Sequence, residues 1–82
     1  MLNRDEIYEK LKGVLVGMDA KNRDKFESAT DSTKLLTDLG LSSVGMLYMV
    51  IAIEETFGIV FDNEKPFETV GEVVDFIAEK LR

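Results

Sequence analysis

The chain has 82 residues, of which 45% are hydrophobic and 32% charged, and its formal net charge at neutral pH is −6. This is a globular composition, and the length predicts a single domain over residues 1–82. The chain contains neither Cys nor His, which excludes disulfides, thiolate metal sites and the Ser-His-Asp and Cys-His forms of catalysis within it. Any thioester chemistry therefore needs a cofactor that brings its own thiol.

The excess of acidic residues is confined to the second part of the chain. Residues 1–34 carry seven acidic and seven basic side chains, whereas residues 35–82 carry nine acidic and three basic ones. Such a surface would repel nucleic acid and would attract a partner with Lys or Arg around its active site; alternatively, the charge serves solubility alone. Because the sequence shows neither a secretory signal pattern nor an apolar run that could span a bilayer, we expect a cytoplasmic protein.

A helix is predicted over Arg4–Met18. Asn3 is a suitable N-cap residue, and Asp5 and Glu6 follow it in the first turn, where the helix dipole favours negative charge. Apolar residues recur at helical spacing and predict one core-facing side, made of Ile7, Leu11, Val14, Leu15 and Met18.

The polar stretch Asp19–Thr37 is predicted to be a long loop, anchored on the helices by Phe26, Leu35 and Leu36. Loops of this length usually have a function or contain a short element of their own. We therefore expect a helical turn near Asp31–Leu35.

A second long helix is predicted from Ser43 to Phe57, ending at Gly58, a suitable residue for a left-handed C-terminus. A leucine-rich segment leads through Gly40 into Ser42 and Ser43 at its start. The N–H groups of a first helical turn lack carbonyl partners and the helix dipole is positive there, so a phosphodiester on one of these serines is favoured. The alternative is that both serines only cap the helix.

This second helix is apolar on all sides, because no charged residue occurs from Leu39 to Ile53. At about 100° per residue, the side predicted to face the core comprises Met46, Met49, Val50, Ile53 and Phe57. The opposite side is expected to face water because it carries two carboxylates, and it comprises Val44, Leu47, Tyr48, Ile51, Glu54 and Glu55. An exposed apolar patch of this kind marks a partner surface; alternatively, the long loop or a second copy of the chain covers it.

After Gly58 we expect one helical turn at Asp62–Lys65 and then a last helix that begins with a capping box formed by Thr69 and Glu72. Its core-facing residues are predicted to be Val70, Val73, Val74, Ile77, Ala78 and Leu81. Together these elements predict an all-α four-helix bundle with three longer helices, one short helix and a long first loop.

Three motifs occur in a familiar order along the chain. Asp38–Val44 (DLGLSSV) is similar to D-L-G-x-D-S-L, Ile53–Ile59 (IEETFGI) is similar to L-E-E-x-F-G-I, and Phe67–Gly71 (FETVG) leads into the last helix. In these motifs the chain resembles the acyl carrier proteins, and the resemblance covers most of its length. It implies a four-helix bundle of the acyl-carrier type.

The resemblance implies that Ser43 is the attachment site of 4′-phosphopantetheine, which a phosphopantetheinyl transferase transfers from coenzyme A. Acyl groups would then be carried as thioesters to enzymes of fatty acid, polyketide or related acyl metabolism, by a monomer that is not itself an enzyme and needs no metal. The resemblance also places the partner-recognition residues on the second helix, namely Val44, Leu47, Ile51, Glu54 and Glu55, and Ser42 and Tyr48 adjoin them.

The chain departs from the family pattern at three positions. Ser42 stands where the family usually has Asp, so it can cap the helix but offers no charge to the transferase. Slower or more selective modification would follow, and Ser42 itself stays an alternative attachment site. Gly45 and Tyr48 stand where acidic residues are common in the family, which makes this face more apolar and indicates a specialised carrier.

Three alternatives to an acyl carrier remain from the sequence. The first is an unmodified, carrier-like interaction module. The second is an aminoacyl or peptidyl carrier, against which Leu41 argues, since Gly is commoner there in such carriers. The third is a small enzyme that uses Asp38 with Glu54 or Glu55. The sequence offers little support for it, because it has no His, no Cys and no residues at a metal-ligand spacing.

Overall fold

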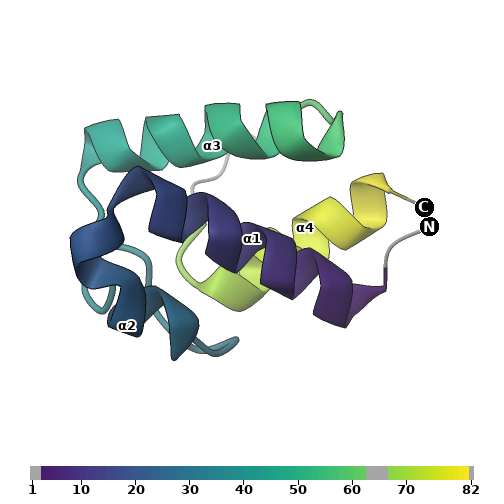
Figure 1. Cartoon of the computed structure of the whole chain (residues 1–82). Helices are drawn as coiled ribbons and strands as arrows, with labels where there is room; N and C mark the ends of the chain where they lie inside the picture. The colour runs from purple at the N-terminus through teal and green to yellow at the C-terminus, as the bar shows by residue number, and fades with distance from the viewer. Residues whose placement is uncertain (1–2, 63–66, 82) are drawn as a thin grey trace.

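The computed structural model describes residues 3–62 and 67–81. Its elements in chain order are α1 (Arg4–Met18), the short 3₁₀ helix η1 (Ala20–Asn22), α2 (Arg23–Glu27), α3 (Ser43–Phe57) and α4 (Val70–Lys80). In Figure 1, α3 lies along one side of α1, and α4 crosses behind α1. Within the described ranges four α-helices and no β-strand occur, which confirms the all-α prediction.

Helix α1 has the predicted bounds because Asn3 closes its first turn. The side-chain oxygen of Asn3 accepts the N–H of Glu6 at 2.8 Å, and the Glu6 carboxylate accepts the N–H of Asn3 at 3.3 Å. This reciprocal pair satisfies two backbone donors that a helix start leaves free. Ile7, Leu11 and Leu15 are buried as predicted, whereas Val14 is only half-buried and Val16 packs against the core instead. Helix α1 contacts α2, α3 and α4, so it forms the centre of the core.

The connection between α1 and α3 contains short helices, but not at the residues where the sequence predicts a helical turn. The short helices lie at 20–27, whereas Asp31–Leu35 forms no helix. The reason is that backbone groups of this stretch pair with the start of α4: the N–H of Leu35 donates to the carbonyl of Glu68, and Lys34 forms an isolated bridge with Thr69. The short helix of the bundle is therefore α2. The turn predicted at Asp62–Lys65 lies outside the described residues apart from its first residue, which is not helical.

The expected loop anchors are correct in two of three cases. Phe26 and Leu35 are buried, but Leu36 is 58% exposed. Leu35 and Leu36 are neighbours in a turn, so their side chains point in different directions, and Leu39 is the other leucine of this connection that is buried in the core.

Helix α4 begins with a capping arrangement at the predicted residues. The Thr69 hydroxyl accepts the N–H of Glu72 at 3.2 Å, and the Glu72 carboxylate accepts the N–H of Glu68 rather than that of Thr69. The predicted core stripe is confirmed, with four residues fully buried and Ala78 and Leu81 packed against them: Val70, Val73, Val74 and Ile77.

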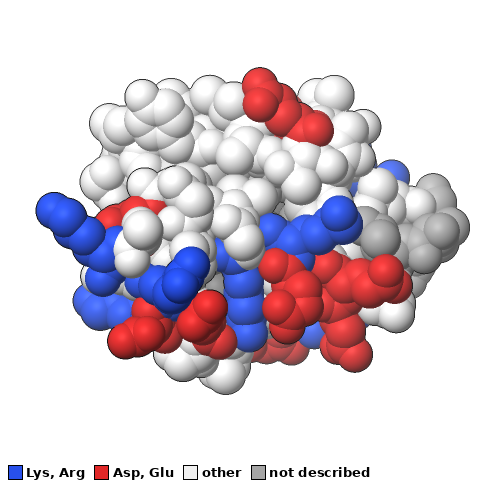
Figure 2. Space-filling model, viewed as in Figure 1, with Lys and Arg blue, Asp and Glu red and all other residues white. Residues whose placement is uncertain are grey.

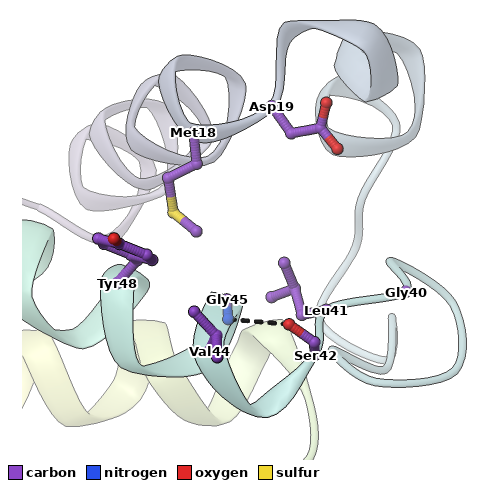
Figure 3. Close-up of a pocket in the computed structure, with 8 residues that line it drawn as sticks. All are labelled: Met18, Asp19, Gly40, Leu41, Ser42, Val44, Gly45 and Tyr48. Carbon is purple, nitrogen blue, oxygen red and sulfur yellow. Dashed lines mark hydrogen bonds between the residues drawn. The ribbon is translucent and has the colours of Figure 1, made fainter.

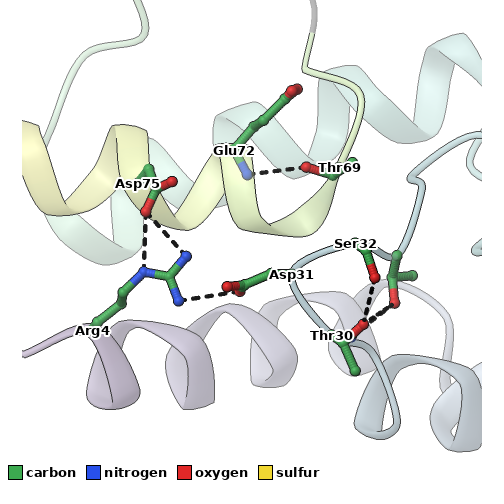
Figure 4. A network of polar contacts seen from close by, with 8 residues as sticks. Arg4, Thr30, Asp31, Ser32, Thr69, Glu72 and Asp75 are labelled. Atoms are coloured by element: carbon green, nitrogen blue, oxygen red, sulfur yellow. Dashed lines mark hydrogen bonds and ion pairs between the residues drawn. The ribbon is translucent and has the colours of Figure 1, made fainter.

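Residues of the connection before α3 are hydrogen-bonded to the first residues of α4. The N–H of Gly71 donates to the carbonyl of Asp31 at 3.0 Å, and the N–H of Val70 donates to that of Thr33 at 2.9 Å. Arg4 of α1 reinforces this contact, since its guanidinium group lies 3.1 Å from the carboxylate of Asp31 and 3.0 Å from that of Asp75 (Figure 4). Residues 31–35 are therefore held against two helices, α1 and α4.

Candidate functional site

The two adjacent serines at the start of α3 have different structural roles. Ser42 is the N-cap: its backbone is extended, and its hydroxyl oxygen accepts the N–H of Gly45 at 3.1 Å. Ser43 is the first helical residue, and its side chain is exposed. The alternative in which both serines cap the helix is therefore wrong for Ser43, whose hydroxyl lies on the surface at the helix N-terminus.

The turn that leads to Ser43 is closed by Asp38. One carboxylate oxygen of Asp38 accepts the N–H of Lys34 at 2.9 Å, and the N–H groups of Asp38 and Leu39 both donate to the carbonyl of Lys34. Leu39 is buried, and Gly40 has a φ of 69°, a left-handed conformation that favours glycine. The Asp-Leu-Gly part of the motif thus builds the turn, which gives Asp38 a structural role in place of the catalytic one considered above.

The exposed side of α3 is apolar over most of its length. Val44 is 62% exposed, Leu47 60%, Tyr48 62% and Ile51 43%, whereas Met49 and Ile53 on the opposite side are fully buried. The predicted orientation of the helix is therefore confirmed, and the connection between α1 and α3 does not cover this face. Figure 2 shows this upper surface over α3 as largely uncharged apart from a red acidic patch, while most other charges lie below it.

Glu54 and Glu55 at the end of this face differ from each other. Glu55 is exposed, as expected. Glu54 is half-buried, and its carboxylate accepts the backbone N–H of Phe61 at 2.9 Å. The expectation that both carboxylates face water is thus wrong for Glu54, because the chain folds back after Gly58 and brings an N–H group without a helical partner to it.

A pocket of about 450 Å³ opens beside Ser43, between the end of α1 and the start of α3 (Figure 3). The residues that line it come from both helices and from the turn before α3, namely Met18, Asp19, Gly40, Leu41, Ser42, Val44, Gly45 and Tyr48. Met18 was expected in the core, but it is only half-buried and points into this space. No sequence pattern indicated the pocket, because it joins residues that lie more than twenty positions apart.

The residues at Ser43 fit a phosphodiester-linked group. The hydroxyl is exposed, and the N–H groups of Ser43 and Val44 in the first turn of α3 have no carbonyl partner within the helix, whereas that of Gly45 already donates to Ser42. In contrast, within residues 3–62 and 67–81 no group of three or more acidic side chains is arranged to hold a metal ion. The described helices also include none with the length and apolarity needed to cross a membrane.

Comparison with known proteins supports the family that the sequence motifs indicate. No family model matches the chain. It is 31% identical to the acyl carrier protein of Thermotoga maritima over 86 aligned residues, which cover 99% of both chains, and 32% identical to that of Borreliella burgdorferi strain B31, over 96% of this chain and 98% of the relative. It is also 32% identical to the mitochondrial acyl carrier protein of Neurospora crassa, over 93% of this chain and 57% of that protein.

The chain belongs to the acyl carrier protein family. Its function is to carry acyl groups for acyl-handling enzymes of the kind found in fatty acid metabolism, and it is a carrier rather than a catalyst.

Proposed function

We propose that this carrier holds its cargo on 4′-phosphopantetheine attached to the Ser43 hydroxyl. The observation that supports this proposal is the exposed side chain of Ser43 in the first turn of α3, directly after a turn that Asp38 closes. Ser42 is a weaker candidate because its hydroxyl already accepts the N–H of Gly45. When bound, the group supplies a terminal thiol that can form a thioester, which the chain cannot do by itself because it has no Cys.

In the attachment reaction, Ser43 acts as the acceptor. Its hydroxyl oxygen forms a bond to the pantetheine-bearing phosphorus of coenzyme A, the pyrophosphate P–O bond breaks, and adenosine 3′,5′-bisphosphate leaves. The chain has no His, so the base that takes the hydroxyl proton belongs to the phosphopantetheinyl transferase. After attachment, the N–H groups of Ser43 and Val44 and the dipole of α3 would stabilise the phosphodiester.

The exposed face of α3 is the proposed docking surface for the transferase and for acyl-transferring or synthase enzymes. Val44, Leu47, Tyr48 and Ile51 offer an apolar contact, and the free carboxylate of Glu55 offers a charge at its far end for a basic group of the partner. Ser42 lies at the near end. The carboxylate of Glu54 is less accessible to a partner than the sequence suggests, because Glu54 is half-buried and one of its oxygens accepts the backbone N–H of Phe61.

The cargo, location and assembly follow from the same proposal. Fatty acyl or polyketide intermediates are favoured over aminoacyl groups on account of Leu41. The carrier is proposed to act as a monomer and as a single domain in the cytoplasm.

Intact-mass analysis tests the attachment site. The unmodified protein, Ser43→Ala and Ser42→Ala are each incubated with coenzyme A and a transferase of broad specificity. We expect the mass of one phosphopantetheine to appear on the unmodified protein and on Ser42→Ala, but not on Ser43→Ala. The reverse pattern would move the site to Ser42, and no mass gain on any of the three would favour an unmodified interaction module.

Two valines of similar exposure test the docking surface. Val44 on α3 is 62% exposed and Val60 beyond the helix is 68% exposed, so the same Val→Ala change can be made on and off the proposed surface. We expect Val44→Ala to raise the KM of the transferase for the carrier severalfold and Val60→Ala to leave it unchanged. Equal effects would contradict the proposed surface.

A further inference from the structure

We infer that the pocket between α1 and α3 binds the part of the prosthetic arm nearest the phosphate, its branched dimethyl segment, when the carrier is not docked. This inference rests on the proposed attachment at Ser43. It concerns residues that the proposed docking surface only partly includes, because Met18, Asp19 and Leu41 come from outside α3.

The lining of the pocket matches the chemistry of this segment. Met18 points from the end of α1 across the space toward Val44 and Leu41, and the Tyr48 ring borders it on the α3 side (Figure 3). These apolar side chains suit a branched hydrocarbon, which gains from leaving water. The segment also carries a hydroxyl and an amide N–H, both hydrogen-bond donors. Asp19 offers them a carboxylate at the rim, of which one oxygen already accepts the side-chain N–H of Asn22 at 2.6 Å.

The position of Ser43 is the reason to assign this occupant. Both chain neighbours of Ser43, Ser42 and Val44, line the pocket, so a group attached to the serine begins at its edge. A short flexible tether gives a local concentration in the millimolar range, and a contact with a dissociation constant of about 1 mM would then be about half occupied. The volume of about 450 Å³ also lies within the range of about 300–1,000 Å³ that is usual for small-molecule sites.

Gly45 keeps this space open. A Cβ atom built at Gly45 would lie 3.5 Å from the Cδ2 atom of Leu41 and 3.5 Å from the hydroxyl oxygen of Ser42. These are ordinary contacts, so a side chain is tolerated there, but it would extend among the lining residues. A larger residue at this position should therefore fill the pocket without breaking α3.

Nuclear magnetic resonance of the loaded carrier tests the inference. Intact mass first shows whether Ser43 carries the group, which separates a failure of attachment from a failure of the pocket. In the loaded protein we expect nuclear Overhauser effects from the geminal methyl protons of the arm to the Met18 methyl group and the Tyr48 ring, and an upfield shift of those methyl protons by the ring. Loaded protein whose arm methyl protons match free pantetheine and show no such effects would overturn the inference, and so would a protein that cannot be loaded.

A matched pair of glycine variants sharpens the test. Gly13 of α1 has no neighbouring atom within 4 Å of a built Cβ and does not line the pocket, so Gly13→Leu is the control for Gly45→Leu. We expect Gly45→Leu to abolish the contacts between the arm and Met18, and Gly13→Leu to preserve them. Should Gly45→Leu lose its dispersed spectrum, Tyr48→Leu serves instead, because it removes the upfield shift and leaves the Met18 contact. Unchanged arm contacts in folded Gly45→Leu would overturn the inference.

Discussion

The carboxylate of Glu54 and the backbone N–H of Phe61 are joined by a hydrogen bond of 2.9 Å. This bond ties the last turns of α3 to the chain that returns after Gly58, whose left-handed conformation ends the helix. Two adjacent acidic residues of one motif therefore have different roles. Glu54 binds the backbone at Phe61, and Glu55 is exposed on the surface.

This difference predicts unequal effects on stability. Glu54→Ala should lower the free energy of unfolding by about 1–3 kcal/mol, because it leaves the half-buried N–H of Phe61 without an acceptor. Glu55→Ala should produce no measurable change, since surface substitutions away from specific contacts are nearly neutral. Urea denaturation followed by circular dichroism measures both, and equal losses would show that the Glu54 bond is not significant in solution.

The two serines give a second matched pair. In the unmodified protein, Ser42→Ala should lower the free energy of unfolding by about 1 kcal/mol, because it removes the acceptor for the N–H of Gly45. Ser43→Ala should leave stability nearly unchanged, or raise it slightly, since Ala is the better helix former. The same denaturation experiment measures the two values, and a larger loss for Ser43→Ala would reverse the roles assigned to the serines.

Replacing two helical glycines with Ala should change the free energy of unfolding in opposite directions. A Cβ at Gly71 would lie 2.8 Å from the carbonyl oxygen and 2.9 Å from the Cβ of Asp31, so Gly71→Ala forces backbone apart and should destabilise the protein by about 1–3 kcal/mol. Gly13 faces open space, and Gly13→Ala should stabilise by up to about 1 kcal/mol. The melting temperatures of the two variants measure these effects. A higher melting temperature for Gly71→Ala would mean that Asp31 does not approach α4 so closely.

Tyr8 should ionise only in strongly alkaline solution. Burial of its hydroxyl, and next the negative charge of Asp31, raise the pKa of Tyr8 to about 12, and the hydroxyl has no hydrogen-bond partner among the described residues. The chain has two Tyr residues, so Tyr48→Phe leaves Tyr8 as the single reporter. Its ultraviolet titration should have a midpoint near pH 12, and adding Asp31→Asn should lower it.

The same shift gives a direction for stability. Between the unfolded pKa of about 10 and the folded pKa of about 12, the unfolded chain holds fewer protons at Tyr8 than the folded one. The contribution of Tyr8 is therefore fully present below pH 10 and is lost as the pH rises toward 12. A Tyr8→Phe variant should lose less stability than the parent protein over this interval, and an identical loss in both would assign the alkaline effect to other groups.

The sequence was sufficient for the features that depend on local patterns. The bounds of α1 follow from the cap at Asn3 and the spacing of Ile7, Leu11 and Leu15, and the exposed side of α3 follows from its helical periodicity and the position of Glu55. Each of these signals lies within a few helical turns, so periodicity and capping rules detect it.

The features that the sequence did not predict depend on contacts between distant segments. The helical turn expected at Asp31–Leu35 is absent because that stretch pairs with residues 68–71. The pocket beside Ser43 needs Met18 and Tyr48 to face each other, and the role of Glu54 needs the chain to return at Phe61. None of these partners lies at a spacing that a helical or extended pattern defines.

The pairing of Lys34 with Thr69 also has a consequence for dissecting this protein. Helix α4 supplies no residue to the pocket beside Ser43, so a truncated version that ends before α4 would keep every side chain of the proposed acceptor region. Such a fragment would nevertheless lose the backbone bonds that hold residues 31–35 in place. The position of the proposed acceptor serine therefore depends on α4 as well as on its own helix, and we expect that removing α4 would not leave a working minimal carrier.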